Sequence, residues 1–162
     1  MSNVLTAGET TTLSGRVHQP RPMPSKPRPA DPLDYHVLLV EDNEDHQPLL
    51  SQILRRAGVR VTIAENGQQA IDLATARREP GSAFDLILMD LQMPVVDGLT
   101  AVRRLRAAGF VHPIVALTAR AVSSDRDNCL KAGFNDFLRK PINGEELIAR
   151  LVAHLGSVPE LP

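Results

Sequence analysis

Four groups of polar residues stand at, or directly after, the ends of apolar runs in this sequence. They are Glu41-Asp42, Asp90, Thr118 and Lys140-Pro141. In an open parallel α/β sheet the carboxyl ends of the strands face one crevice, so side chains far apart in the sequence can meet there. Carboxylates, a hydroxyl and an ammonium in one crevice can hold a divalent cation and let a carboxylate accept a phosphoryl group. The sequence therefore predicts a phosphorylatable site.

Five short apolar runs have to position those groups. They cover residues 36–40, 59–63, 84–89, 114–117 and 137–138, and longer helix-like segments alternate with them. This alternation predicts an α/β doubly wound fold with five strands and five helices. The first, third and fourth runs are almost continuously apolar, which is typical of central strands covered on both faces. In the second run Arg60 and Thr62 alternate with apolar residues, which favours an edge strand.

Glycine and proline predict where the helices end. We expect Gly58 to end the first helix, the Pro80-Gly81 pair the second, Gly109 the third and Gly133 the fourth. Pro48 falls early in the first helix, where proline is tolerated only within the first turn. We therefore expect that helix to start late or to bend.

The composition permits one folded domain. With 162 residues, of which 43% are hydrophobic, the chain can bury one core of ordinary size. The net charge of −1 gives no reason to expect nucleic acid as a partner. Cys129 is the only cysteine, which excludes an internal disulfide and fits a reducing, cytoplasmic location. We find neither a signal peptide nor an apolar run of membrane-spanning length.

The first 34 residues differ from the rest of the chain. Six prolines lie between His18 and Leu33, interleaved with basic residues. Such a segment favours extended conformations and buries little apolar surface. We predict a disordered Pro-rich tail or linker over residues 1–34, a folded domain over 35–156 and a short tail over 157–162.

Four strings carry a resemblance to a known family. They are VLLVEDN, DLILMDLQMPVVDG, PIVALTA and AGFNDFLRKPI, in this order between residues 35 and 155. Together they resemble the receiver domain of two-component response regulators, above all the C-terminal receiver of hybrid histidine kinases. The resemblance implies a flavodoxin-like (βα)5 fold whose five parallel strands have the order 2-1-3-4-5. The Pro-rich N-terminal segment favours the interpretation that this sequence is a fragment of a longer chain. If that longer chain is a hybrid kinase, the whole protein would be a histidine kinase.

The resemblance also assigns roles to the polar residues. Asp90 matches the phosphoacceptor, which a phosphohistidine would modify. Glu41 and Asp42 match the acidic pair that holds Mg²⁺ (or Mn²⁺) together with Asp90 and the backbone carbonyl of Gln92. The phosphoryl oxygens would be held by Thr118 and Lys140, and Pro141 matches a cis-proline that aims Lys140.

A switch would follow phosphorylation. Thr118 would move toward the phosphoryl group, and Phe137, at the position of the family's switching aromatic residue, would turn into the vacated space. Filling the core is the alternative role for Phe137. The expected output surface comprises the fourth helix, the fifth strand and the fifth helix. The expected partners are a histidine kinase or a histidine-containing phosphotransfer protein, and a downstream protein that the sequence does not identify.

Two alternatives to a receiver stay open. The first is an enzyme, a flavodoxin-like aspartyl-phosphate hydrolase that turns over on Asp90. Gln92 stands where an aspartyl phosphatase carries its second aspartate, which argues against it. The second is a scaffold that works without phosphorylation, although every expected chemical position is filled. We predict a module that catalyses only its own modification and is not otherwise an enzyme.

Overall fold

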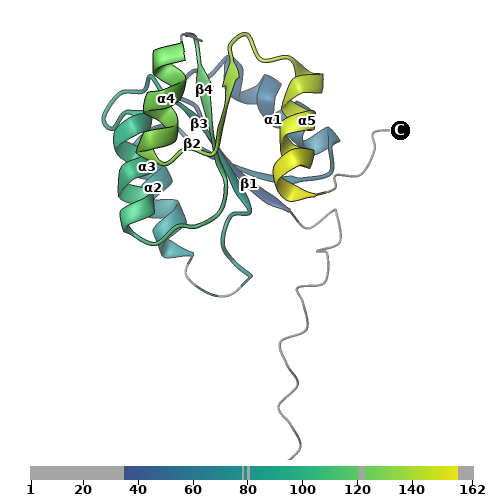
Figure 1. The fold of residues 1–162 in the computed structure, drawn as a ribbon. Coiled ribbons are helices and arrows are strands. Elements are labelled where there is room, and N and C mark those ends of the chain that lie inside the picture. Colours follow the sequence, from purple (N-terminus) through teal and green to yellow (C-terminus); the bar gives the residue numbers. More distant parts are fainter. Residues whose placement is uncertain (1–34, 78, 80, 121–122, 157–162) are drawn as a thin grey trace, which may run out of the picture.

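The computed structural model describes residues 35–77, 79, 81–120 and 123–156, in which strands and helices alternate (Figure 1). The strands are β1 (His36–Val40), β2 (Arg60–Ala64), β3 (Leu86–Asp90), β4 (Ile114–Thr118) and β5 (Asp136–Arg139). The helices are α1 (His46–Arg56), α2 (Gly67–Ala76), α3 (Gly98–Ala107), α4 (Ser123–Ala132) and α5 (Gly144–Leu155). The predicted tails, residues 1–34 and 157–162, lie outside the described residues.

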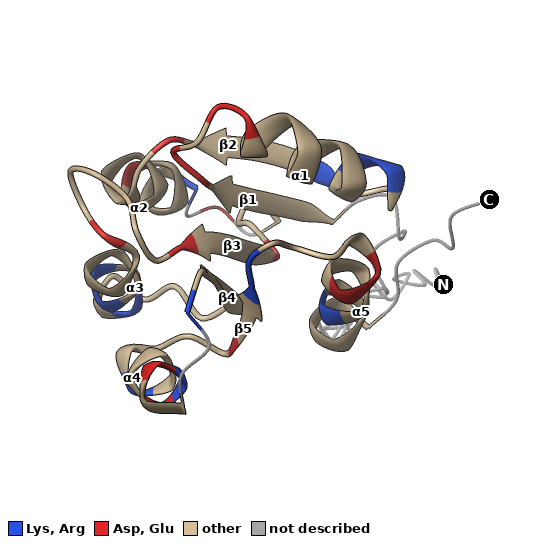
Figure 2. Cartoon of the chain, turned by 90° about the horizontal axis from the view of Figure 1, so that it is seen from above, with Lys and Arg blue, Asp and Glu red and all other residues tan. Residues whose placement is uncertain are grey.

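The strands form one parallel sheet in the order β2-β1-β3-β4-β5. This confirms the predicted doubly wound, flavodoxin-like fold. Figure 2 shows α1 and α5 on one face of the sheet and α2, α3 and α4 on the other. Every residue of β1, β3 and β4 is buried, whereas β2 lies at an edge, as the patterns of the apolar runs predicted. All five strands therefore end at the same side of the sheet.

Each face of the sheet has its own apolar core. Phe84, Val102 and Leu105 are buried on the side of α2 and α3, and Leu54 and Leu151 are buried on the side of α1 and α5. Burying such a side chain contributes about 1.5–3 kcal/mol, so the two cores fix the sheet between its helices. The loops at the carboxyl ends of the strands thus start from rigid positions.

Pro48 lies within the first turn of α1, where the sequence analysis expected proline to be tolerated. The helix begins at His46, which makes Pro48 its third residue. An N–H at that position has no acceptor within the helix, so the missing donor of proline costs little there. The second helix ends at Ala76, four residues before the Pro80-Gly81 pair that we expected to end it. Its start is fixed by Asn66, whose side chain accepts a hydrogen bond from the Gln69 N–H.

Cys129 is buried in α4 and packs in the core on that side of the sheet. Its burial, followed by the charge of Asp125, raises the pKa of the thiol, which disfavours the reactive thiolate. Among the described residues, no helix combines the length and the apolar character that crossing a bilayer requires.

His36 is a buried histidine at the start of β1. Its Nε2 lies 2.7 Å from the Thr62 hydroxyl, and its Nδ1 lies 3.4 Å from a nitrogen of Arg77. Because a guanidinium only donates hydrogen bonds, Nδ1 acts as the acceptor and the ring is neutral. Burial, then the charges of Arg77 and Arg60, lower the pKa of His36 from its usual 6.5, while Asp85 opposes them.

This environment makes stability depend on pH. The unfolded chain binds a proton on His36 more readily than the folded chain does. The contribution of neutral His36 to the free energy of unfolding is therefore fully present above pH 6.5 and is lost progressively as the pH falls below it. We expect the urea midpoint of the parent chain to fall more between pH 7.5 and pH 5.5 than that of a His36→Gln variant. A His112→Gln variant should follow the parent. Equal losses in the parent and in His36→Gln would contradict the assignment.

Candidate functional site

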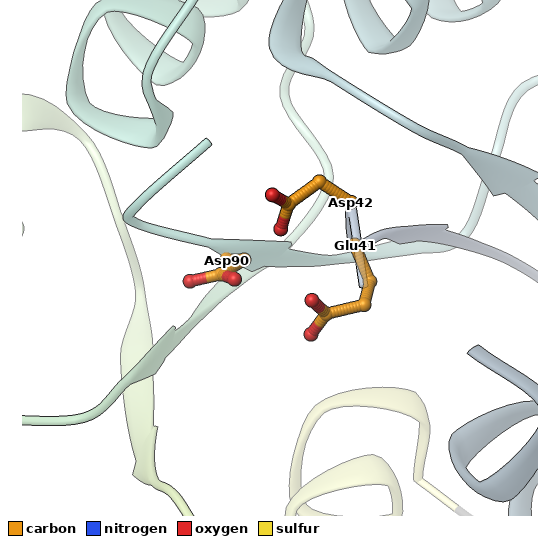
Figure 3. Close-up of side chains that lie close together, drawn as sticks. All are labelled: Glu41, Asp42 and Asp90. Carbon is orange, nitrogen blue, oxygen red and sulfur yellow. The ribbon is translucent and has the colours of Figure 1, made fainter. Parts of the chain in front are cut away.

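Three carboxylates meet at the ends of β1 and β3. Glu41 and Asp42 directly follow β1, and Asp90 is the last residue of β3. One oxygen from each lies within 4.8 Å of the others, and Figure 3 shows the three groups gathered at the ends of the two strands. Glu41 is 0% exposed and Asp90 6% exposed, whereas Asp42 is exposed. The structure thus brings together the predicted acidic pair and the predicted phosphoacceptor.

Lys140 links two of these carboxylates. Its Nζ donates to Glu41 Oε2 at 2.8 Å and to Asp90 Oδ2 at 2.9 Å. Burial would lower the pKa of Lys140, but the hydrogen bonds to Glu41 and Asp90 outweigh it and raise the pKa, so the amine is charged. The Lys140 N–H donates to the Thr118 carbonyl (2.7 Å), which holds the Lys140 backbone beside the end of β4. The Lys140–Pro141 peptide bond is cis.

This donor set fits a hard divalent cation. The cluster consists of carboxylates alone, and oxygen ligands of this kind are those that Mg²⁺ takes in proteins. Three carboxylates beside one ammonium leave an excess of negative charge in a largely buried crevice. A divalent cation beside Asp42, the member that faces solvent, would balance that excess.

Thr118 ends β4 next to the site, but its hydroxyl faces its own loop. The hydroxyl donates to the Arg120 carbonyl (2.8 Å) and accepts from the Arg120 N–H (3.0 Å). Leu117, the residue before it, is the register partner of Asp90. Thr118 is therefore close to Asp90 in the sheet, and its hydroxyl would have to leave Arg120 to reach a group on Asp90. Sequence reasoning did not single out Arg120, because this contact depends on the path of the loop.

The other predicted residues surround the cluster. The Gln92 N–H donates to Asp90 Oδ1 (3.1 Å), so the backbone of Gln92 lies against the Asp90 carboxylate, while residue 92 is exposed. Phe137 is half-buried in β5, and the guanidinium of Arg126 lies 5.4 Å from the centre of its ring. A contact of this kind contributes about 0.5–1 kcal/mol at an exposed site. Sequence reasoning missed Arg126, which approaches Phe137 only because α4 packs beside β5.

Gly98 also supports the site and was missed. A Cβ built on Gly98 would lie 2.4 Å from the backbone oxygen of Asp90 and 2.9 Å from Leu91 Cα. Only glycine allows the start of α3 to come so close to the end of β3. The Asp97-Gly98 pair was a usable signal, since an acceptor followed by glycine often marks a helix start, and Asp97 accepts from the Thr100 N–H (2.8 Å).

Comparison with known proteins gives a consistent result. Residues 37–152 match the family model of the response regulator receiver domain. Two-component response regulator ORR41 of Oryza sativa subsp. japonica is 41% identical over 113 residues, which are 68% of this chain and 87% of that protein. The hybrid signal transduction histidine kinase I of Dictyostelium discoideum is 40% identical over 111 residues, 66% of this chain. The alignment spans only 6% of that kinase and, for the related kinase M, 5%.

Solved structures agree with these matches. The receiver domain of sensor histidine kinase PA1611 from Pseudomonas aeruginosa PAO1, described with a magnesium ion coordinated in the active site cleft, shares 45% identity with a TM-score of 0.67. That alignment covers 76% of this chain and 98% of that domain. A co-crystal structure of Saccharomyces cerevisiae Ypd1 with the receiver domain of Ssk1 matches at 32% identity and a TM-score of 0.67, covering 74% and 88% of the two chains.

Proposed function

This chain belongs to the family of response regulator receiver domains, and we propose that Asp90 is its phosphoacceptor. The observation that carries the proposal is the contact of Asp90 with charged Lys140 inside the carboxylate cluster. A receiver acts in two-component signalling as a module that is modified and read by other proteins. The chain would catalyse only its own phosphorylation and dephosphorylation.

The chemical step is a phosphoryl transfer to a carboxylate oxygen. An oxygen of Asp90 attacks the phosphorus of a phosphohistidine, a P–O bond forms, and the P–N bond breaks with its electrons leaving on the imidazole. The product on Asp90 is an acyl phosphate. Lys140 already donates to Asp90 Oδ2, so its ammonium is placed to hold the phosphoryl oxygens. Thr118 would add a hydroxyl donor once it leaves Arg120.

The cation is expected to be Mg²⁺, with Mn²⁺ as a chemically similar substitute. Its ligands would be Glu41, Asp42, Asp90 and the backbone carbonyl of Gln92. When bound, such a cation neutralises charge between the carboxylates and an incoming anionic phosphoryl group. The magnesium described for the PA1611 receiver supports this choice.

The response would start at Thr118 and Phe137. Turning the Thr118 hydroxyl toward Asp90 removes both of its hydrogen bonds to Arg120 and frees the loop before α4. Phe137 would then lose its contact with Arg126 and rotate inward. The surface that changes is formed by α4, β5 and α5, and a downstream protein would read it.

The donor would be a histidine kinase or a histidine-containing phosphotransfer protein in the cytoplasm. The co-crystal structure of Ypd1 with the Ssk1 receiver supports this type of partner. An apolar surface lies beside the site: Leu49 is 56% exposed and, with Pro141 and Ile142, lines a hollow of about 120 Å³ that Lys140 borders. A partner docked there would hold its histidine beside Asp90. We place the folded domain at residues 35–156.

Intact-protein mass spectrometry tests the phosphoacceptor. After incubation with acetyl phosphate and Mg²⁺ we expect one added phosphoryl group, with none in the presence of a chelator. The group should be absent from Asp90→Ala and present at the parent level in Asp127→Ala, which changes an exposed aspartate of α4. Labelling of Asp90→Ala would contradict the proposal. Sustained release of phosphate from an external phosphomonoester would favour a hydrolase. If neither labelling nor release of phosphate were observed, a scaffold would be favoured.

A further inference from the structure

The outer edge of β2 is open in the described part of the chain. The Arg60 N–H donates to the Tyr35 carbonyl (2.8 Å), and the Ala64 carbonyl accepts from the Glu41 N–H (3.0 Å), so both residues face β1. Backbone groups alternate sides along a strand, and the N–H and C=O groups of Val61 and Ile63 therefore point away from the sheet. An edge of this kind is a template for another strand.

A groove runs beside that edge, between β2 and α1. It has a volume of about 560 Å³ and is lined by Gln47, Pro48, Ser51, Gln52, Arg55, Arg56 and Ile63. Ile63 is only half-buried and packs in neither core. Ser51, near the middle of the groove, is 3% exposed, and its hydroxyl has no hydrogen-bond partner among the described residues. The groove thus combines an incompletely covered apolar strand with an unsatisfied polar group.

Charges of opposite sign flank the two ends of α1, the helix that forms one wall of the groove. Arg55 and Arg56 are exposed at the end of α1, and Glu44 and Asp45 are exposed directly before it. Figure 2 shows the acidic loop at one end of α1 and the basic residues at the other. None of these four side chains forms an ion pair within the described residues. A surface with an acidic end and a basic end is complementary to itself when one copy is reversed.

We propose that this edge joins two copies of the chain around a two-fold axis, with their β2 strands pairing antiparallel and Thr62 facing Thr62. Val61 of each copy then lies opposite Ile63 of the other. These are the residues whose backbone groups point outward, so each such pair exchanges both of its N–H···O=C hydrogen bonds. The result is one continuous sheet of ten strands with four new backbone hydrogen bonds.

The charges at the two ends of α1 also fit this two-fold axis. Reversing one copy places α1 beside α1 in opposite directions, so Arg55 and Arg56 meet Glu44 and Asp45 of the second copy. An acidic or a basic peptide would match the charge at only one end of α1, which is why a second copy is the occupant that fits. The surface formed by α4, β5 and α5 lies at the opposite edge of the sheet and stays free.

Sedimentation velocity of the full chain over a wide concentration range tests the dimer. We expect the parent to reach the mass of two chains. An Ile63→Pro variant should stay monomeric, because it removes an outward N–H that makes no hydrogen bond within the described chain. Val111→Pro, which changes a valine that is 80% exposed elsewhere, should still dimerise. Labelling of Asp90 with acetyl phosphate should be unchanged in Ile63→Pro, which separates lost pairing from lost folding. A parent that is monomeric at about 200 μM, or a dimeric, folded Ile63→Pro, would overturn the proposal.

A charge exchange tests the orientation of the two copies. Arg55→Glu/Arg56→Glu makes both ends acidic, and Glu44→Lys/Asp45→Lys makes both ends basic. Each variant alone should dimerise at least about tenfold more weakly than the parent, because like charges then meet at both ends. Mixed together, the two variants should form a heterodimer, since every contact regains opposite charges. If the mixture associates no better than either variant alone, the antiparallel arrangement is wrong.

Discussion

A Lys140→Met variant is expected to unfold with about 3 kcal/mol less free energy than the parent chain in the absence of divalent cations. Lys140 supplies the positive charge that Glu41 and Asp90 share at 2.8 and 2.9 Å, and Glu41 is 0% exposed. Removing one partner of a buried ion pair leaves the other charge without compensation. Methionine keeps much of the apolar stem of lysine, so the loss measures the ammonium rather than packing. Urea unfolding in a chelator gives the value.

The same variant should also label more slowly. Loss of a donor that stabilises developing charge commonly costs about 100-fold in rate, so we expect acetyl phosphate to modify Lys140→Met about 100-fold more slowly than the parent. Lys131→Met, which changes an exposed lysine of α4, should match the parent in both measurements. If Lys140→Met kept the stability and labelling rate of the parent, the ammonium would have no role at Asp90.

The largest effect of a ligand should come from Mg²⁺. At a free concentration about 100 times its dissociation constant, a cation that binds only the folded chain raises the free energy of unfolding by about 2.7 kcal/mol. We expect this gain in the parent, because the folded chain gathers three carboxylates within 4.8 Å and the unfolded chain does not. Urea midpoints measured over a Mg²⁺ titration, at constant ionic strength, give the size of the gain.

An Asp42→Asn variant tests whether the stabilisation by Mg²⁺ comes from this site. Asp42→Asn removes the exposed carboxylate of the cluster and should lose most of the stabilisation by Mg²⁺. Asp45→Asn changes another exposed aspartate three residues later, which is outside the cluster, and should respond like the parent. Equal stabilisation of Asp42→Asn and the parent would place the cation elsewhere.

The pattern of apolar residues was sufficient to predict the sheet. Strands buried on both faces read as continuous apolar runs, and β1, β3 and β4 are buried throughout. Alternation of Arg60 and Thr62 with apolar residues identified the edge strand β2, since only an edge leaves room for polar side chains on one face. Helix ends were harder to predict: α2 stops at Ala76 although no glycine or proline lies within three residues of it. Arg77, the residue directly after α2, contacts His36 and Phe84. The end of this helix therefore coincides with tertiary contacts that no local pattern of residues marks.

The sequence by itself determined which chemical groups are available and which end of the sheet they share, because a parallel α/β sheet sends the residues after its strands to one crevice. On this basis Glu41, Asp42, Asp90 and Lys140 were predicted to lie together, and the structure brings them together. Only the tertiary structure decided that Lys140 bridges Glu41 and Asp90, and that the Thr118 hydroxyl bonds to Arg120. These contacts join separate loops or depend on the path of one loop. Their geometry is set by packing across the whole sheet, which no local pattern of residues encodes.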